Sequence, residues 1–379
     1  MAHAPSAAAD LVLIGGGHSH ALLLRRWGQR PAPAARLTLV TPHTVAEYSG
    51  MLPGHVAGLY DRREIEIDLA RLAHRAGARL ILDRATGLDL RGRRVMLAGG
   101  APLAFDLASV DIGVEAGAGD VPGLADHGLP VKPAARFLAG WQRFADTGGG
   151  ALAIIGGGVA GIEIALAARR RLPNIAITVI EAAPAMLREL SPRARRLVLA
   201  RARSGRIALV TGRAVARVGP EGLWLRDGGA IPARLVVAAT GGQVGGWLGR
   251  SGLAMQGDRM RVDATLRSSH PAVFGVGDCA VLAGAPRPQA GVFAVRQAPV
   301  LDHNLRAALA GTGRMRAYRP QRDWLRLIAA GGDAVADKWG IALGGPWVWR
   351  WKDRIDRRFM AMLSDPPRRR KPGGISRAP

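Results

Sequence analysis

Ala151-Leu-Ala-Ile-Ile-Gly-Gly-Gly-Val-Ala-Gly-Ile-Glu163 is the stretch of sequence that decides the fold. Its first five residues are apolar, as in a short buried strand, and the residues after the glycines predict a helix that runs through Arg171. In a dinucleotide-binding turn the first glycine makes the bend and the second lets the backbone approach a pyrophosphate, while the helix N-terminus offers free N–H groups. The spacing of Gly156, Gly158 and Gly161, with Val159 opening the helix, therefore predicts a nucleotide site.

A carboxylate completes this pattern. The strand predicted over Ile175 to Ile180 ends in Glu181, about twenty residues after the turn, where an acidic side chain can accept both hydroxyls of an adenosine ribose. The same carboxylate repels a 2′-phosphate, so NADH is expected in preference to NADPH.

A second, less regular copy lies near the N-terminus. The strand Asp10 to Ile14 leads into Gly15-Gly16-Gly17-His18-Ser19-His20 and a helix over Ala21 to Trp27. His20 replaces the third glycine, so this copy alone fits a nucleotide turn and an ordinary glycine-rich strand–helix turn equally well. Two such units suggest two nucleotides, of which the first is usually FAD and the second a nicotinamide cofactor.

Composition narrows the classes of protein. The 379 residues suit two domains with an appendage, and the formal net charge of +24 comes from arginines spread along the whole chain, so no nucleic-acid site is expected. The single cysteine, Cys279, excludes an internal disulfide, and we expect it to be a small core residue. No secretory signal is expected, because Met1 to Asp10 lacks a basic segment followed by an apolar stretch. No transmembrane segment is predicted, because glycines and Glu163 interrupt the apolar run Ala151 to Ala168.

Two further segments carry a resemblance to a known family. Ala272-Val-Phe-Gly-Val-Gly-Asp-Cys-Ala280 resembles the second FAD motif of the pyridine nucleotide-disulfide oxidoreductase superfamily, and Val236-Val-Ala-Ala-Thr-Gly241 resembles its ATG strand–turn. The resemblance implies that Asp278, preceded by Gly277, accepts a hydrogen bond from the flavin's ribityl chain, and that Gly241 closes the nicotinamide domain. Ser109-Val-Asp-Ile-Gly113 stands where a second ATG is expected.

Within this superfamily the chain resembles the type II NADH dehydrogenase and sulfide:quinone reductase branch. The loop Tyr48-Ser-Gly-Met-Leu-Pro53 matches the segment that lies against the isoalloxazine, which implicates Ser49, Gly50, Met51 and Pro53. The helix after Gly291 and Val292 matches the one whose N-terminus points at the flavin's pyrimidine end. The likeness is closest to the flavoprotein module fused ahead of selenophosphate synthetase, through HSHALLLRRWG, YSGMLPG, LPVKPAARFLAGW and WRWKDRIDRRFM.

The resemblance implies an FAD-dependent NAD(P)H oxidoreductase, which passes hydride from NADH to the flavin and electrons on to an external acceptor such as a quinone. The alternative is a regulatory or partner flavoprotein that is linked to selenophosphate synthetase and has little turnover. Glu163 is expected to meet the nicotinamide carboxamide or to cap the structure, and Lys132 to approach the flavin edge or to be solvated. No metal is expected. The implied FAD contacts in the first domain are Gly15, Gly17, His18, Ser19, Thr41 and Gly113.

These signals together predict an α/β protein with two Rossmann-like three-layer domains and a C-terminal cap. The FAD domain spans 8–115 and 244–318, the NAD(P)H domain 116–243 is inserted in it, and the cap 319–379 carries a basic, Trp-rich amphipathic segment. If Pro346 to Leu363 is helical, an apolar stripe flanked by cations results, formed by Trp347, Trp351, Ile355 and Phe359. That stripe fits a membrane interface, or packing on the flavin domain or on a second subunit of a homodimer. A cytoplasmic protein is expected, with peripheral contact to the inner face of the membrane in the first case.

Overall fold

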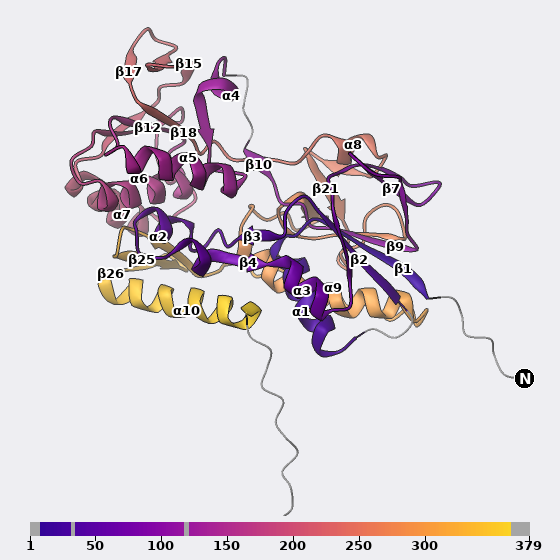
Figure 1. Ribbon diagram of the computed structural model, residues 1–379. Helices are drawn as coiled ribbons and strands as arrows, with labels where there is room; N and C mark the ends of the chain where they lie inside the picture. Colours follow the sequence, from indigo (N-terminus) through magenta and orange to yellow (C-terminus); the bar gives the residue numbers. More distant parts are fainter. Residues whose placement is uncertain (1–7, 32–34, 117–120, 365–379) are drawn as a thin grey trace, which may run out of the picture.

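The computed structural model describes residues 8–31, 35–116 and 121–364. A first five-stranded parallel sheet has the order β22-β9-β1-β2-β5, with strands β1 (Ala9–Ile14), β2 (Ala35–Thr41), β5 (Arg79–Leu82), β9 (Leu107–Val110) and β22 (Val273–Gly275). Its central strands are apolar and almost fully buried, as expected when both faces of a parallel sheet are covered. The helices beneath it in Figure 1 are α1 (His18–Gln29), α3 (Leu69–Arg75) and α9 (Gly291–Leu309).

A second parallel sheet has the order β11-β18-β12-β13-β14 and is formed by β11 (Gly128–Pro130), β12 (Leu152–Ile155), β13 (Ile177–Glu181), β14 (Ala208–Thr211) and β18 (Leu235–Ala238). Its layers are completed by helices α4 (Leu124–His127), α5 (Ala134–Asp146), α6 (Val159–Arg171) and α7 (Pro192–Ser204), and by the antiparallel strands β15 (Val215–Gly219), β16 (Gly222–Leu225) and β17 (Ala230–Pro232). The structure therefore confirms the predicted α/β class with two Rossmann-like sheets.

One pair of antiparallel strands connects the two sheets: β10 (Glu115–Ala116) pairs with β19 (Gly242–Gln243). The chain leaves the first sheet after β9, builds the whole second sheet, and returns to add β22 beside β9. The remaining short elements lie outside the two parallel sheets: β3 (Val45–Glu47), α2 (Leu52–Val56), η1 (Arg62–Ile65), β4 (Glu66–Asp68), β6 (Ala85–Asp89), β7 (Arg94–Leu97), β8 (Leu103–Ala104), α8 (Trp247–Arg250), β20 (Met255–Gln256), β21 (Arg259–Val262), η2 (Gly277–Cys279) and β23 (Ala280–Leu282). Helix α2 contacts α5 and α6 of the second domain.

The C-terminal part forms an antiparallel sheet of β24 (Arg326–Ala329), β25 (Ala334–Lys338) and β26 (Ile341–Gly345), followed by α10 (Pro346–Ser364). Helix α10 lies along β25 and β26 and reaches β4 of the first domain (Figure 1), while α6 and α7 of the second domain contact the same small sheet. The cap therefore contacts both nucleotide-binding folds.

The apolar stripe predicted on α10 needs one correction. Trp347, Trp351 and Ile355 are exposed, whereas the Phe359 ring lies tilted against Tyr48, with ring centroids 4.7 Å apart, so the four side chains do not share one exposed face. Residues four apart advance by about 400° on an α-helix, so the fourth member of such a series has turned by about 120° from the first. Lys352 is buried, on the face of α10 that Val348 and Asp356 share.

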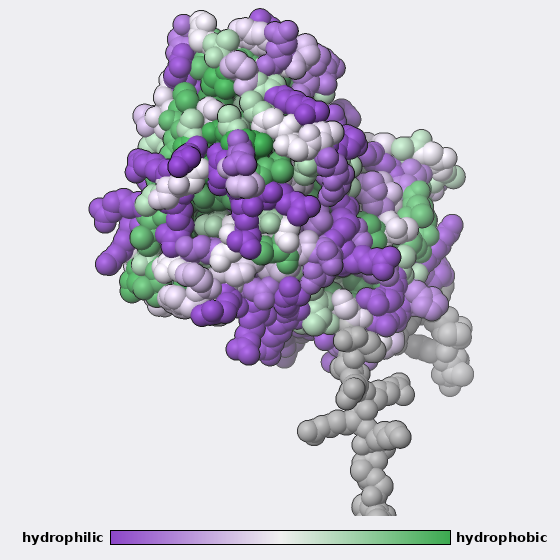
Figure 2. Space-filling view, turned by 60° about the vertical axis from the view of Figure 1, so that its left-hand side comes forward, coloured by the Kyte–Doolittle hydropathy of each residue, from purple (hydrophilic) through white to green (hydrophobic). Residues whose placement is uncertain are grey.

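No helix among the described residues is long and apolar enough to cross a bilayer. The apolar run that begins at Ala151 is divided between β12 and α6, as predicted. Figure 2 shows hydrophilic residues spread over one whole face of the molecule, with smaller hydrophobic areas between them. The basic run Arg368 to Lys371 lies outside the described residues.

Candidate functional site

The second glycine-rich turn, between β12 and α6, has the geometry of a nucleotide turn. Gly156 has a φ of +111°, and a Cβ added there would overlap the carbonyl of Ala239. A Cβ at Gly161 would overlap the carbonyl of Gly156, so only glycine lets α6 start this close to the strand. Gly158 is the extended N-cap of α6, and Gly241 follows β18 with a φ of +90°.

Two carboxylates bind the backbone amides of this turn. Glu181, at the end of β13, accepts hydrogen bonds from the amides of Gly157 and Ala183, each at 2.8 Å. The exposed Glu189 accepts from the amide of Val159 at 2.7 Å, at the N-terminus of α6 where a phosphate would bind. Sequence reasoning missed Glu189, because it lies in the loop after β13 and nothing in its neighbours' pattern indicates that the loop folds back.

The first turn, between β1 and α1, is closed by the side chain that replaces its third glycine. The buried His20 ring bonds to the Gly15 carbonyl through Nδ1 at 2.7 Å and to Ser109 Oγ through Nε2 at 2.9 Å. Burial lowers the pKa of His20 to about 4, so the ring is neutral at pH 7. His20 thus bonds to backbone, as predicted, and Ser19 Oγ ties the start of α1 to α9 by donating to the Ala294 carbonyl at 2.8 Å.

The carboxylate of Asp111 lies at the N-terminus of α1, where only an indirect signal in the sequence pointed to it. Its Oδ2 accepts a hydrogen bond from the amide of His20 at 3.0 Å, and the amide of Ser19 also bonds to this carboxyl. A Cβ added at Gly17 would overlap the carboxylate itself. The one available signal was an acidic residue at the place of the expected second ATG, at the end of a buried parallel strand.

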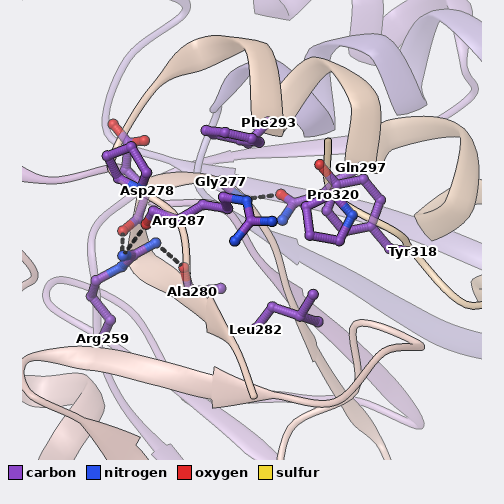
Figure 3. Close-up of a pocket in the computed structure, with 11 residues that line it drawn as sticks. Arg259, Gly277, Asp278, Ala280, Leu282, Arg287, Phe293, Gln297, Tyr318 and Pro320 are labelled. Atoms are coloured by element: carbon purple, nitrogen blue, oxygen red, sulfur yellow. Dashed lines mark hydrogen bonds between the residues drawn. The ribbon is translucent and has the colours of Figure 1, made fainter. Parts of the chain in front are cut away.

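Asp278 and Lys132 come together beside this turn, from η2 and from the segment after β11. Lys132 Nζ lies 3.1 Å from Asp278 Oδ2, and the amide of Gly277 donates to Gln297 Oε1 at 2.8 Å. A small cavity of about 20 Å³ is lined by Gly277, Asp278 and Gln297. In Figure 3, Arg259 on its rim donates to the carbonyls of Asp278 and Ala280.

Cys279 lies in the core directly after Asp278. It is fully buried, and burial raises the pKa of its thiol to about 12. A thiol that stays protonated at neutral pH is a poor nucleophile, in accord with the structural role predicted for it.

The loop Tyr48–Pro53 is held by the buried face of α10. Lys352 Nζ donates to the Gly50 carbonyl at 2.6 Å and pairs with Asp356 Oδ2 at 2.6 Å. The hydroxyl of Tyr48 donates to the other oxygen of Asp356 at 3.1 Å. The neighbouring Met51 and Pro53 are buried, whereas Ser49 is exposed.

His18 connects this loop to the start of α9. Its ring meets the ring of Tyr48 edge-on, with centroids 5.5 Å apart, and it is the nearest group to a Cβ added at Gly291, at 3.8 Å. Val292 follows Gly291 in the first turn of α9. The predicted flavin residues His18, Tyr48, Gly291 and the Lys132–Asp278 pair therefore surround one region, because Asp278 and Lys132 also act electrostatically on His18.

Three predicted residues have other surroundings. Thr41 ends β2 and is buried, and its hydroxyl accepts from the amide of His43. Gly113 has a φ of +65° and open space around it. Glu163 points at the cap, where its Oε1 accepts from the amide of Ala329 at 2.6 Å, and burial raises its pKa to about 7 despite the opposing charge of Lys352. Among the described residues no group of three or more acidic, histidine or cysteine side chains could hold a metal.

Two parallel sheets, each with a glycine-rich turn between a buried strand and the helix that follows it, are the architecture of a protein that binds two dinucleotides. The family model described as pyridine nucleotide-disulphide oxidoreductase matches residues 9–298, and the chain belongs to that family. Members of this family bind FAD and NAD(P)H, so the prediction that the chain binds FAD and a nicotinamide cofactor is confirmed, while the preference for NADH over NADPH stays a prediction.

Individual relatives show how far the likeness extends. Over 209 residues the chain is 31% identical to the ferredoxin–NAD(+) reductase component of a biphenyl dioxygenase system from Paraburkholderia xenovorans (strain LB400); this covers 52% of the chain and 49% of the relative. The match thus spans about half of that relative's length.

Two solved structures share the fold over nearly the whole chain. The sulfide:quinone oxidoreductase of Aquifex aeolicus has a TM-score of 0.77 at 17% identity, covering 94% of this chain and 91% of that one. The NDH2 of Plasmodium falciparum has a TM-score of 0.78 at 12% identity, covering 93% and 97%.

The residues present fit FAD in the first domain, with one point of conflict. The positive φ of Gly15, the bare Gly17 and the free amides at the start of α9 provide the bends and donors that a dinucleotide needs. The side chain of Asp278 is 17% exposed, so its carboxylate can accept a hydrogen bond from a ribityl hydroxyl. The conflict is Asp111, whose carboxylate lies where the first turn would receive a phosphate.

Proposed function

We propose that the chain oxidises NADH and passes the electrons through FAD to a quinone at a membrane surface. The bound flavin supplies the two-electron relay. Glu181 favours NADH, because a carboxylate at the end of β13 repels the 2′-phosphate of NADPH. The single cysteine leaves no intramolecular pair to receive electrons, so the acceptor must come from outside the chain.

The arrangement of α10 is the observation that carries the choice of acceptor. Its buried face bonds to Gly50 and Tyr48 of the loop that we assign to the flavin. An adjoining face of α10, together with β26 and the turn before it, exposes a set of large apolar side chains, which we call the apolar face: Trp339, Ile341, Leu343, Trp347, Trp351 and Ile355. An apolar acceptor dissolved in a bilayer would meet the protein here, one helix away from the flavin loop.

The reaction also needs a proton, since NADH, one proton and a quinone give NAD⁺ and the quinol. Glu163 is suited to hold it near neutral pH, because burial raises the pKa of its carboxyl to about 7. Lys352 acts on Glu163 electrostatically and bonds to the Gly50 carbonyl, so this carboxyl lies in the same part of the molecule as the flavin loop. We assign Lys132 to the flavin edge through its pair with Asp278.

Anaerobic reduction of the FAD-loaded protein tests the proposal. The absorbance of the oxidised flavin, at about 450 nm, should bleach on addition of NADH, and a short-chain quinone should restore it. An FAD-loaded protein that NADH leaves oxidised would rule out the hydride step. Bleaching by NADH without reoxidation by any quinone would rule out the acceptor and favour the alternative, a partner flavoprotein with little turnover.

A further inference from the structure

The carboxylate of Asp111 lies at the contact point of both FAD motifs. It bonds to the amide of His20 at the start of α1. A Cβ added at Gly17 of the first motif, or at Gly277 of the second, would overlap it. Asp111 is 2% exposed, so solvent does not share the site. In a dinucleotide turn such glycines make room for a phosphate, but in this chain the carboxylate of Asp111 fills that space.

A helix N-terminus offers its unpaired amides and its partial positive charge to one anion. In this chain the amides of Ser19 and His20 at the start of α1 already donate to the carboxylate of Asp111. A pyrophosphate that approached the same amides would meet a negative charge in a buried, weakly screened place. Binding therefore requires that the carboxyl either leave the site or lose its charge.

We propose that Asp111 controls FAD binding by holding the phosphate position of the first turn in the flavin-free protein and by taking up a proton when FAD enters. The neutral carboxyl then donates a hydrogen bond to a phosphate oxygen instead of repelling it. This inference rests on the FAD assignment of the family and adds a residue that the family resemblance does not supply.

The groups around Asp111 support this behaviour. Burial raises the pKa of the Asp111 carboxyl to about 7, and the negative charge of Asp278 raises it too, while the amides of His20 and Ser19 lower it. The His20 ring is neutral, and the Cys279 thiol, which feels the Asp111 charge, stays protonated. The negative charge of the neighbouring Asp278 is partly balanced by its ion pair with Lys132. Close to neutral pH the carboxyl can thus exist in both forms.

The direction of the pH dependence follows. A bound pyrophosphate adds negative charge beside the carboxyl and raises its pKa further, so FAD binding above pH 7 takes up a proton. The affinity for FAD is constant while Asp111 is protonated and falls by about tenfold for each pH unit above its pKa in the flavin-free protein. If bound FAD instead favoured the charged carboxylate, the affinity for FAD would rise with pH.

Titration of the flavin-free protein with FAD is the test, read by flavin fluorescence and calorimetry rather than by turnover. For the natural chain we expect the dissociation constant to rise at least about tenfold between pH 6 and pH 8.5, with close to one proton taken up at the higher pH. The Asp111→Asn variant keeps the side-chain shape and one acceptor. It should bind FAD at least about tenfold more tightly than the natural chain at pH 8.5, with no pH dependence.

Glu189→Gln is the matched control, because it makes the same exchange at the other turn, where Glu189 is exposed and bonds to Val159. This variant should retain the pH dependence of FAD binding. The inference would be overturned if FAD affinity depended on pH as steeply in the Asp111→Asn variant as in the natural chain. It would also be overturned if the affinity of the natural chain did not depend on pH, a result that requires no variant to fold. Absence of FAD binding in every protein at every pH would overturn the inference and the proposed function together, whereas pH-dependent binding without NADH oxidation would overturn the function alone.

Discussion

Glu181 shows what a single residue contributes to the second nucleotide site. Its two oxygens hold the amides of Gly157 and Ala183, so the carboxylate is fixed at the mouth of the turn before any nucleotide arrives. A fixed negative charge can discriminate between nucleotides without moving, because rejection of a 2′-phosphate needs only proximity.

We expect Glu181→Gln to raise the KM for NADH by about tenfold, with kcat nearly unchanged, because it removes charge-assisted hydrogen bonds of about 1.5–3 kcal/mol that are made equally in the ground and transition states. The ratio of kcat/KM for NADPH to that for NADH should rise by a similar factor, which steady-state assays with both nucleotides measure. The Glu189→Gln variant serves as comparison, since its carboxylate lies at the phosphate end of the turn. An unchanged cofactor ratio would show that Glu181 does not contact the ribose.

Helix α10 is the element that connects the cap to the flavin loop. Along its inner face Lys352 and Asp356 are a buried ion pair, each side chain 6% exposed, surrounded by Val348, Met360 and Leu363. Burying two charges is unfavourable unless each finds partners, and here Gly50 and Tyr48 supply them. The pair therefore fixes which way the loop faces rather than simply adding stability.

Replacing one partner tests this view. Lys352→Met leaves Asp356 buried without its counter-charge and should lower the free energy of unfolding by about 3–5 kcal/mol. The double variant Lys352→Met/Asp356→Leu removes both charges and should recover most of that loss. Urea unfolding followed by circular dichroism measures both, with Arg354→Ala on the exposed face as a control that should change stability by less than about 0.5 kcal/mol. If the double variant is as unstable as the single one, the pair is not the cause.

At the scale of the whole molecule, the cap places the apolar face and the two nucleotide turns on one body. Its small sheet contacts α6 and α7 of the second domain, and α10 contacts β4 and α1 of the first. Docking of the apolar face onto a bilayer would bring the flavin loop close to the membrane surface. The protein would then need no spanning helix to reach a quinone, in keeping with the peripheral attachment to the inner face of the cytoplasmic membrane that we propose.

We expect the double variant Trp347→Ser/Trp351→Ser to bind anionic phospholipid vesicles at least about tenfold more weakly, because each indole buried in the interface contributes on the order of 1 kcal/mol or more. Vesicle flotation measures the bound fraction. Leu82→Ser is the control: Leu82 is 58% exposed but lies on β5, away from α10, and its loss should leave flotation unchanged. Equal flotation of the double variant and the natural chain would exclude the apolar face as a membrane contact.

Local patterns allowed most of the fold to be predicted. Glycine spacing predicted both turns, because backbone overlap at Gly156 and Gly161 forbids any side chain there. The apolar repeat fits the helix α10, but by itself it did not show that Phe359 lies against Tyr48 or that Lys352 is buried. A pattern within one element reports its periodicity and does not report what packs against each face.

The sequence by itself determined two strand–turn–helix units, their order and the class of cofactor, because sterics and hydrophobic period act between neighbours in the chain. Only the tertiary structure decided which side chains meet at the turns. Asp111 reaches His20 across 91 positions because β9 lies beside β1, and Lys352 reaches Gly50 across 302 because the cap folds back. Such pairings depend on strand order and on docking between distant segments, for which the residues nearby in sequence carry no signal.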